Sequence, residues 1–196
     1  MRGGARRTDG YSLVELLLVL LTATTIVSVA LPVTSGSLDA GRARHAAGFV
    51  AARFRLARQQ AAARTTVVSL VFDRVGSRWM VRVCGDGNGN GVRRSEITSG
   101  VDRCFDGPLD LEAMFPGVQV ALDSSIRGPS GEPPSPDAVR FGASDMASFS
   151  PSGSCTAGSL FLRSARSVQY AIRVAGVTGR TRILRYNVVS RSWDEL

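Results

Sequence analysis

The chain has 196 residues, 44% of them hydrophobic, and its 24 basic side chains are all arginine, against 16 acidic ones. This length and apolar content suit one modest globular domain plus one additional element, and they exclude a disordered chain. The net charge of +8 is uneven, because residues 1–85 and 146–196 are basic whereas residues 86–145 are acidic.

The first pattern along the chain is a long apolar run. Residues 11–31 carry a single charge, on Glu15. A helix of this length, at about 1.5 Å per residue, spans roughly the 30 Å of a bilayer's hydrocarbon core. Arg2, Arg6 and Arg7 precede the run, so the positive-inside rule keeps the N-terminus cytoplasmic. We therefore predict a single-pass membrane helix over 11–31, with the remainder of the chain on the outer side of the membrane.

A secretory signal peptide is the alternative interpretation of this run. Ser28-Val29-Ala30 is an acceptable small-x-small cleavage site. However, the run is longer than the usual signal core of about 7–15 residues. A carboxylate near its start is also costly in a segment that has no further role. Both features favour a retained membrane helix.

The residues at the start of the run resemble a known leader. Gly10-Tyr11-Ser12-Leu13-Val14-Glu15, followed by an apolar helix, is similar to the class III leader of type IV pilins and type II secretion pseudopilins. The resemblance implies that a prepilin peptidase removes residues 1–10 by cutting after Gly10 and then methylates the new N-terminal amine on Tyr11. The family's usual first mature residue is Phe, so Tyr11 is a departure that keeps the aromatic ring.

Cleavage at this point would give Glu15 a role. It would become the fifth residue of the mature chain, about one helical turn from a new ammonium group. A carboxylate in hydrocarbon needs such a partner. In the family this acid is thought to neutralise the N-terminus of a neighbouring subunit during filament assembly. The alternative is a tolerated glutamate at the membrane interface.

An amphipathic helix is expected to continue over residues 32–65. Its apolar residues recur at near-helical spacing, and arginines occupy much of the remainder. The apolar positions are Leu38, Ala46, Phe49, Val50, Phe54, Ala57 and Ala61. We expect this stripe to pack on the chain's own globular domain. Pro32 lacks a backbone donor and is expected to kink or locally melt the helix, as in pilin-like subunits.

Residues 66–196 have the pattern of a β domain. Short β-rich runs alternate with turn residues. These runs are TVVSLVF (66–72), WMVRVC (79–84), VQVAL (118–122), SLFLRS (159–164), VQYAIRV (168–174) and TRILRYNVV (181–189). The segment RGPSGEPPSPD (127–137) is rich in Gly, Pro and Ser and is expected to be a mobile surface loop.

The C-terminal half carries a second resemblance. FSPSGSC (149–155), two strands, and then Gly179-Arg180-Thr181-Arg182 are similar to the corresponding part of the GspH/FimT branch of minor pilins and pseudopilins. Together the patterns predict an α+β fold of the pilin-like kind, in which a long N-terminal helix packs on a C-terminal antiparallel β domain.

One loop resembles half of a calcium site. Asp86, Asn88 and Asn90 alternate and are followed by Gly91, as in the first half of an EF-hand loop. The second half departs, because the twelfth position is Ile97 and Glu96 comes one place early. A plain hairpin turn built on the Asn-Gly pairs is the alternative. Calcium is the only cofactor suggested.

Cys84 and Cys104 bracket this loop, and the periplasm permits disulfides. Closing about 20 residues stabilises a fold by roughly 3 kcal/mol in the chain-entropy model. Pairing of Cys104 with Cys155 is the main rival. Zinc is not indicated, since there is no CxxC motif and the single histidine, His45, lies on the predicted helix.

No nucleophile elbow, Walker motif or dinucleotide glycine motif occurs, so we expect no enzyme. We expect a GspH/FimT-like minor pilin or pseudopilin of a type II secretion system or a type IV pilus. Its expected partners are other pilin subunits, the prepilin peptidase and the inner membrane.

DNA binding during natural uptake is the alternative function. Residues 146–193 contain seven arginines and no acid, a plausible footprint for phosphates. Some FimT-like pilins are understood to bind DNA through a Gly-Arg-x-Arg stretch, which implicates Arg180 and Arg182 here. The alternative interpretation is an ordinary arginine-rich surface whose charge balances the acidic residues 86–145.

Overall fold

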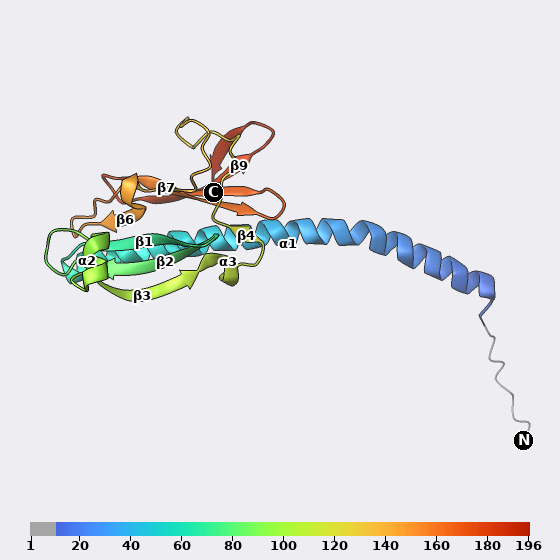
Figure 1. Ribbon diagram of the computed structural model, residues 1–196. Coiled ribbons are helices and arrows are strands. Elements are labelled where there is room, and N and C mark those ends of the chain that lie inside the picture. The colour runs from blue at the N-terminus through green and yellow to red at the C-terminus, as the bar shows by residue number, and fades with distance from the viewer. Residues whose placement is uncertain (1–10) are drawn as a thin grey trace, which may run out of the picture. The chain divides into compact units, whose positions relative to one another are not determined.

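The computed structural model describes the backbone of residues 11–196 and the side chains of residues 11–28 and 36–196 (Figure 1). The chain divides into two compact units, one that extends up to Leu38 and one that comprises Asp39–Leu196. Helices and antiparallel strands form the regular secondary structure of the described residues. The predicted α+β class is therefore confirmed.

Helix α1 (Leu13–Arg64) is 52 residues long and supplies the helical part of the first unit. The helix continues without a break through residue 32, so the expected local melting at Pro32 is not seen. A proline removes only one backbone donor, and the turns on either side keep their own hydrogen bonds.

The N-terminal predictions fall partly outside the described residues. These include the leader 1–10 with Gly10 and its three arginines, and the side chains of residues 29–35. Within the described part of the chain, no helix is both long and apolar enough to cross a membrane. The membrane-spanning segment 11–31 therefore stays a prediction.

In the second unit, one face of α1 is buried and consists mainly of small side chains. The buried apolar residues are Ala43, Ala46, Ala47, Val50, Ala51, Phe54, Ala57 and Ala61. Alanine favours helix and has little volume, so strands can approach this face closely. Two members of the predicted stripe differ: Phe49 is only partly buried, and Leu38, at the end of the first unit, is 59% exposed.

The first sheet has the strand order β3-β2-β1-β6. Its strands are β1 (Val68–Val75), β2 (Arg78–Gly85), β3 (Arg103–Asp110) and β6 (Met146–Phe149). A tight turn joins β1 to β2, where Gly76 has a positive φ of 63°, a conformation that favours glycine. Two short helices, α2 (Arg94–Ser99) and α3 (Leu111–Met114), come before and after β3.

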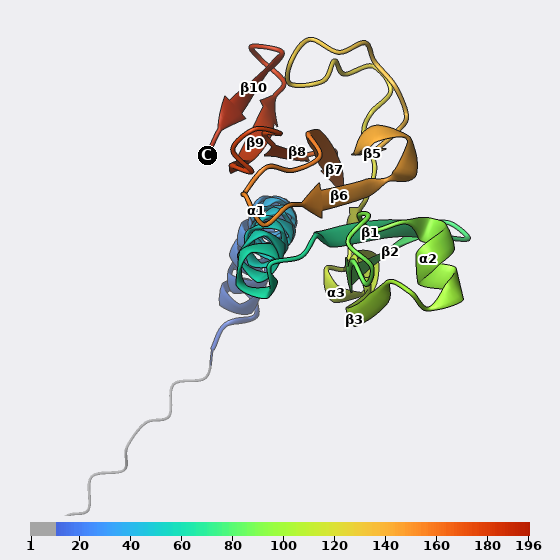
Figure 2. The same cartoon turned by 90° about the vertical axis from the view of Figure 1, so that its left-hand side faces the viewer.

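The second sheet has the order β10-β9-β8-β7-β4, and β5 also pairs with β7. Its strands are β4 (Val118–Gln119), β5 (Val139–Arg140), β7 (Gly158–Ser164), β8 (Gln169–Val174), β9 (Thr181–Asn187) and β10 (Ser192–Glu195). A short 3-10 turn, η1 (Gly142–Ser144), lies between β5 and β6. Figure 2 views α1 nearly end-on, with β8 and β9 on one side of it and β1 and β2 on another.

The centre of the core is aromatic. Phe54 of α1 is fully buried, and its ring centroid lies 5.5 Å from that of Phe141 and 6.2 Å from those of Phe72 and Phe149. These rings come from the helix, from β1 and β6, and from the residue after β5. Phe54 therefore joins α1 to segments that are far apart in the sequence.

Side chains on both faces of β7 are buried. Leu160 and Leu162 alternate with Phe161 along β7 and are buried in the same core as the helix. On the opposite face, Phe161 packs against Trp193 of β10. The Trp193 Nε1 donates to the carbonyl of Arg127 at 2.8 Å. The glycine- and proline-rich segment 127–137 forms no helix or strand and most of its residues are exposed, as a surface loop would be, and this bond ties its first residue to β10.

Candidate functional site

The structure contains a disulfide between Cys84 and Cys104. The two residues lie directly opposite each other in the β2–β3 ladder, and Cys84 is buried. Cys155 is a free, half-buried cysteine. The bridge holds together the two ends of the segment that contains the predicted calcium loop.

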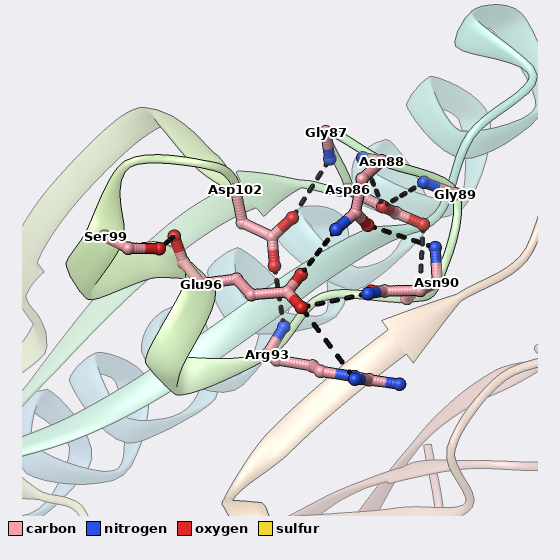
Figure 3. A network of polar contacts seen from close by, with 10 residues as sticks. Asp86, Gly87, Asn88, Gly89, Asn90, Arg93, Glu96, Ser99 and Asp102 are labelled. Atoms are coloured by element: carbon pink, nitrogen blue, oxygen red, sulfur yellow. Dashed lines mark hydrogen bonds and ion pairs between the residues drawn. The ribbon is translucent and has the colours of Figure 1, made fainter.

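Within this loop, two carboxylates bind backbone N–H groups (Figure 3). Asp86 accepts from the backbone N–H groups of Asn88 at 3.0 Å and of Gly89 and Gly91 at 2.7 Å. Asp102 is buried and accepts from Gly87 and Arg93 at 3.0 and 2.8 Å. These bonds satisfy donors that no strand pairs, so the two acids fix the shape of the loop.

Glu96 lies where the loop's side-chain amides converge (Figure 3). The Nδ2 atoms of Asn88 and Asn90 donate to its two oxygens at 3.1 and 2.9 Å. Ile97, at the position where an EF-hand has its bidentate acid, instead packs on a small buried cluster with Val92. Glu96 is therefore the acid that faces the loop.

The calcium prediction meets a specific difficulty in this geometry. Calcium takes six to eight oxygen ligands, whereas the amide nitrogens of Asn88 and Asn90 face Glu96. Among the described residues, no group of three His, Cys, Asp or Glu side chains is placed to hold a metal ion. As these side chains lie, the loop is closed by its own hydrogen bonds, and calcium binding by Asp86, Asn88 and Asn90 stays a prediction.

Asp86 should make the stability of the protein depend on pH. Burial raises the pKa of this carboxyl, but hydrogen bonds from the backbone of Gly91, Asn88, Gly89 and Asn90 outweigh it, and the pKa falls below its usual 3.8. The folded-state pKa is thus below the unfolded one, so Asp86 stabilises the fold at pH values above 3.8 and this contribution is lost as the pH falls through the folded pKa. Asp86→Asn should lower the free energy of unfolding by about 1 kcal/mol at neutral pH.

The measurement is urea denaturation of the wild-type protein and of Asp86→Asn, each at pH 7 and at pH 3. The difference in their free energies of unfolding should be smaller at pH 3 than at pH 7. Asp194→Asn is the control, because Asp194 is exposed and only accepts from the side chains of Asn187 and Ser192. A pH-independent loss for Asp86→Asn would contradict the proposed charge effect.

At the other end of the chain, Tyr11 and Glu15 are exposed at the start of α1. Glu15 lies in the first turn of the helix, where a negative charge complements the helix dipole. Gly10, after which cleavage is expected, lies outside the described residues.

The Gly-Arg-x-Arg stretch begins in the turn after β8, with Gly179 and Arg180, and ends in β9, with Thr181 and Arg182. Arg180 and Arg182 both approach one carboxylate, that of Glu195 in β10, at 3.6 and 3.4 Å. Arg173 is directly opposite Arg182 in the ladder and pairs with Glu132 at 3.4 Å. The acids that neutralise this patch therefore come from distant segments. The side chains of Arg180 and Arg182 nevertheless stay 64% and 47% exposed.

A cluster that the sequence did not single out lies beside this stretch. Arg58 of α1 fits against Gly153 and Gly179, which brings the FSPSGSC segment next to the Gly-Arg-x-Arg stretch. Burial raises the pKa of the nearby Cys155 thiol, and the Arg58 guanidinium and a hydrogen bond from Gly179 only partly offset this. His45, the one histidine, is exposed on α1.

The chain matches no family model, no curated protein and no solved structure.

Proposed function

We propose that this protein is a minor pilin or pseudopilin-like subunit of the GspH/FimT kind, which is anchored in the inner membrane and assembled into a type II secretion or type IV pilus filament. The observation that carries the proposal is the sequence Gly10-Tyr11-Ser12-Leu13-Val14-Glu15, of which the last three residues begin the 52-residue helix α1. The second half of the same helix packs in the core of an α+β domain.

The exposed apolar side chains of the first unit support this proposal. Leucine, valine and isoleucine side chains at positions 13–27 are all more than half exposed. A continuous apolar surface of this size marks a contact with lipid or with another protein. In a filament subunit, lipid would cover it before assembly and neighbouring helices afterwards.

Glu15 supports the proposal by its charge. It is the only charged residue in the apolar run, and a carboxylate in hydrocarbon needs a positive partner. Cleavage after Gly10 creates such a partner, the ammonium of Tyr11, on the same chain and on each neighbouring copy. A pairing between copies would set the register of one subunit against the next.

The second unit is compatible with a periplasmic location. Its Cys84–Cys104 disulfide is of the kind that persists in oxidising compartments. DNA uptake stays a second prediction for this unit. Because Arg180 and Arg182 share Glu195, a phosphate would have to compete with that carboxylate.

Replacing Gly10 with valine tests the proposal directly. A glycine without a Cβ is what the pilin peptidase accepts before the cut, so Gly10→Val should leave a full-length, unmethylated precursor in the membrane. Mass spectrometry of the N-terminal peptide measures this. The wild-type protein should begin at a methylated Tyr11.

Gly4→Val is the matched control, because it makes the same change within the leader and away from the cut. Its processing should be unchanged. A mature wild-type chain that begins at Leu31 would contradict the proposal and identify an ordinary signal peptide cut after Ala30.

A further inference from the structure

Three serine hydroxyls gather in the segment that follows β6. The Oγ of Ser150 lies 2.8 Å from that of Ser152 and 2.7 Å from that of Ser154, and the last two are 3.5 Å apart. Among the described residues, these hydroxyls bond only to one another, and Ser152 and Ser154 are exposed. Each hydroxyl carries one donor that can rotate, so all three can turn toward an acceptor from outside.

Arg58 brings a positive charge to the same place. A Cβ built on Gly153, between Ser152 and Ser154, would lie only 3.4 Å from the Arg58 Nη2. Arg58 is exposed, and within the described part of the chain it forms no ion pair or hydrogen bond. Its donors are therefore available beside the hydroxyls.

Backbone packing fixes the position of this arginine. A Cβ on Gly179 would lie 3.1 Å from the Arg58 Cδ and Nε and 2.6 Å from the carbonyl oxygen of Gly153. The side chain of Arg58 thus passes between two loops that touch each other, one after β6 and one before β9. In Figure 2 the segment after β6 runs across the end of α1. A guanidinium held in this way loses less freedom when it binds a ligand.

We propose that Arg58 and the hydroxyls of Ser150, Ser152 and Ser154 bind a tetrahedral oxyanion, namely a phosphate group. Converging hydroxyl and guanidinium donors, with no carboxylate paired to the arginine, match the acceptor oxygens of a phosphate. The set is small and compact, which suits a single phosphate better than an extended chain of them. This inference is independent of the filament role.

The test is equilibrium dialysis of the full chain, in non-ionic detergent, against radiolabelled inorganic phosphate at constant ionic strength. The wild-type protein should bind one phosphate per chain, saturably and at about millimolar concentration. Arg58→Gln should weaken binding about tenfold or more, because it removes a charged donor. The triple variant Ser150→Ala, Ser152→Ala and Ser154→Ala should weaken it comparably while keeping the charge.

Arg55→Gln is the matched control. Arg55 is also exposed and lies on the same helix about one turn away, and its replacement by glutamine removes the same charge. Its affinity should stay within about twofold of wild type. Circular dichroism should show that all the variants fold, since their changes are at surface positions.

A second arm distinguishes the source of the phosphate. A duplex oligonucleotide without terminal phosphates that displaces the label from wild type would support the site and assign it to a phosphodiester. A duplex without effect would support the site and assign it to a free phosphate or a monoester. Absence of saturable binding, or an equal loss in Arg55→Gln and Arg58→Gln, would overturn the proposal.

Discussion

Phe54→Ala is expected to lower the free energy of unfolding by about 3–5 kcal/mol. The ring is fully buried and contacts three other phenylalanine rings, those of Phe72, Phe141 and Phe149. Alanine would leave a cavity between α1 and the strands. The surrounding rings come from segments with fixed backbones, so they cannot move together enough to fill it.

Urea denaturation of the full chain in detergent, followed by tryptophan fluorescence, measures this loss. Trp79 and Trp193 are both partly buried against the core and report on its unfolding. Leu56→Ala is the control, because Leu56 lies on the same helix and is 40% exposed. Similar losses in the two variants would mean that Phe54 does not hold the position in the core described here.

Removing the disulfide is the second large change. The double variant Cys84→Ser, Cys104→Ser should lose about 3 kcal/mol, because the bridge closes a segment of 20 residues and restricts the unfolded chain. It also frees the ends of the loop that Asp86 and Asp102 organise. Chemical denaturation under oxidising conditions measures the loss.

Cys155→Ser serves as the control for this pair. Its thiol is free and half-buried and donates only to the carbonyl of Ala175, so the change should be within about 1 kcal/mol. Peptide mapping without reductant should link the peptides of Cys84 and Cys104. A Cys104–Cys155 link, or an equal loss in Cys155→Ser, would contradict the assignment.

Strands with clear alternation were predictable from the sequence. The pattern over 168–174 corresponds to β8 (Gln169–Val174), and that over 181–189 contains β9 (Thr181–Asn187). Strand β3 (Arg103–Asp110) was not predicted. It contains a glycine and a proline, most of its residues are exposed, and its pairing with β2 is irregular. Such a strand is defined by its partner and by the disulfide, neither of which leaves a periodic pattern.

Composition predicted only part of what the structure shows for segment 127–137. Its glycines and prolines correctly indicate the absence of regular structure, but they do not indicate where the segment lies. The contact that ties its first residue to β10, between the carbonyl of Arg127 and the indole of Trp193, joins residues 66 positions apart. A hydrogen bond of this kind carries no local signal in the sequence.

Contacts between residues far apart in the sequence also limited the prediction of the candidate sites. The charge count found an arginine-rich end without acids, but Glu132 and Glu195 reach Arg173, Arg180 and Arg182 only in the folded chain. The grouping of Arg58 with the serines of residues 150–154 depends on the packing of α1 against two loops. Motif spacing could find Asp86 and Asn88, but it could not show which way the amide groups would turn.

The alanine-rich buried face of α1 also determines which positions of this helix tolerate substitution and which do not. A larger side chain at Ala43, Ala47 or Ala51, each fully buried, would push the strands away from the helix and destabilise the core. The exposed positions of the same helix, among them Arg42, Arg44 and Arg55, are free of that restriction. Over evolutionary time, this helix could exchange the residues it offers to other molecules while its fold remained unaltered.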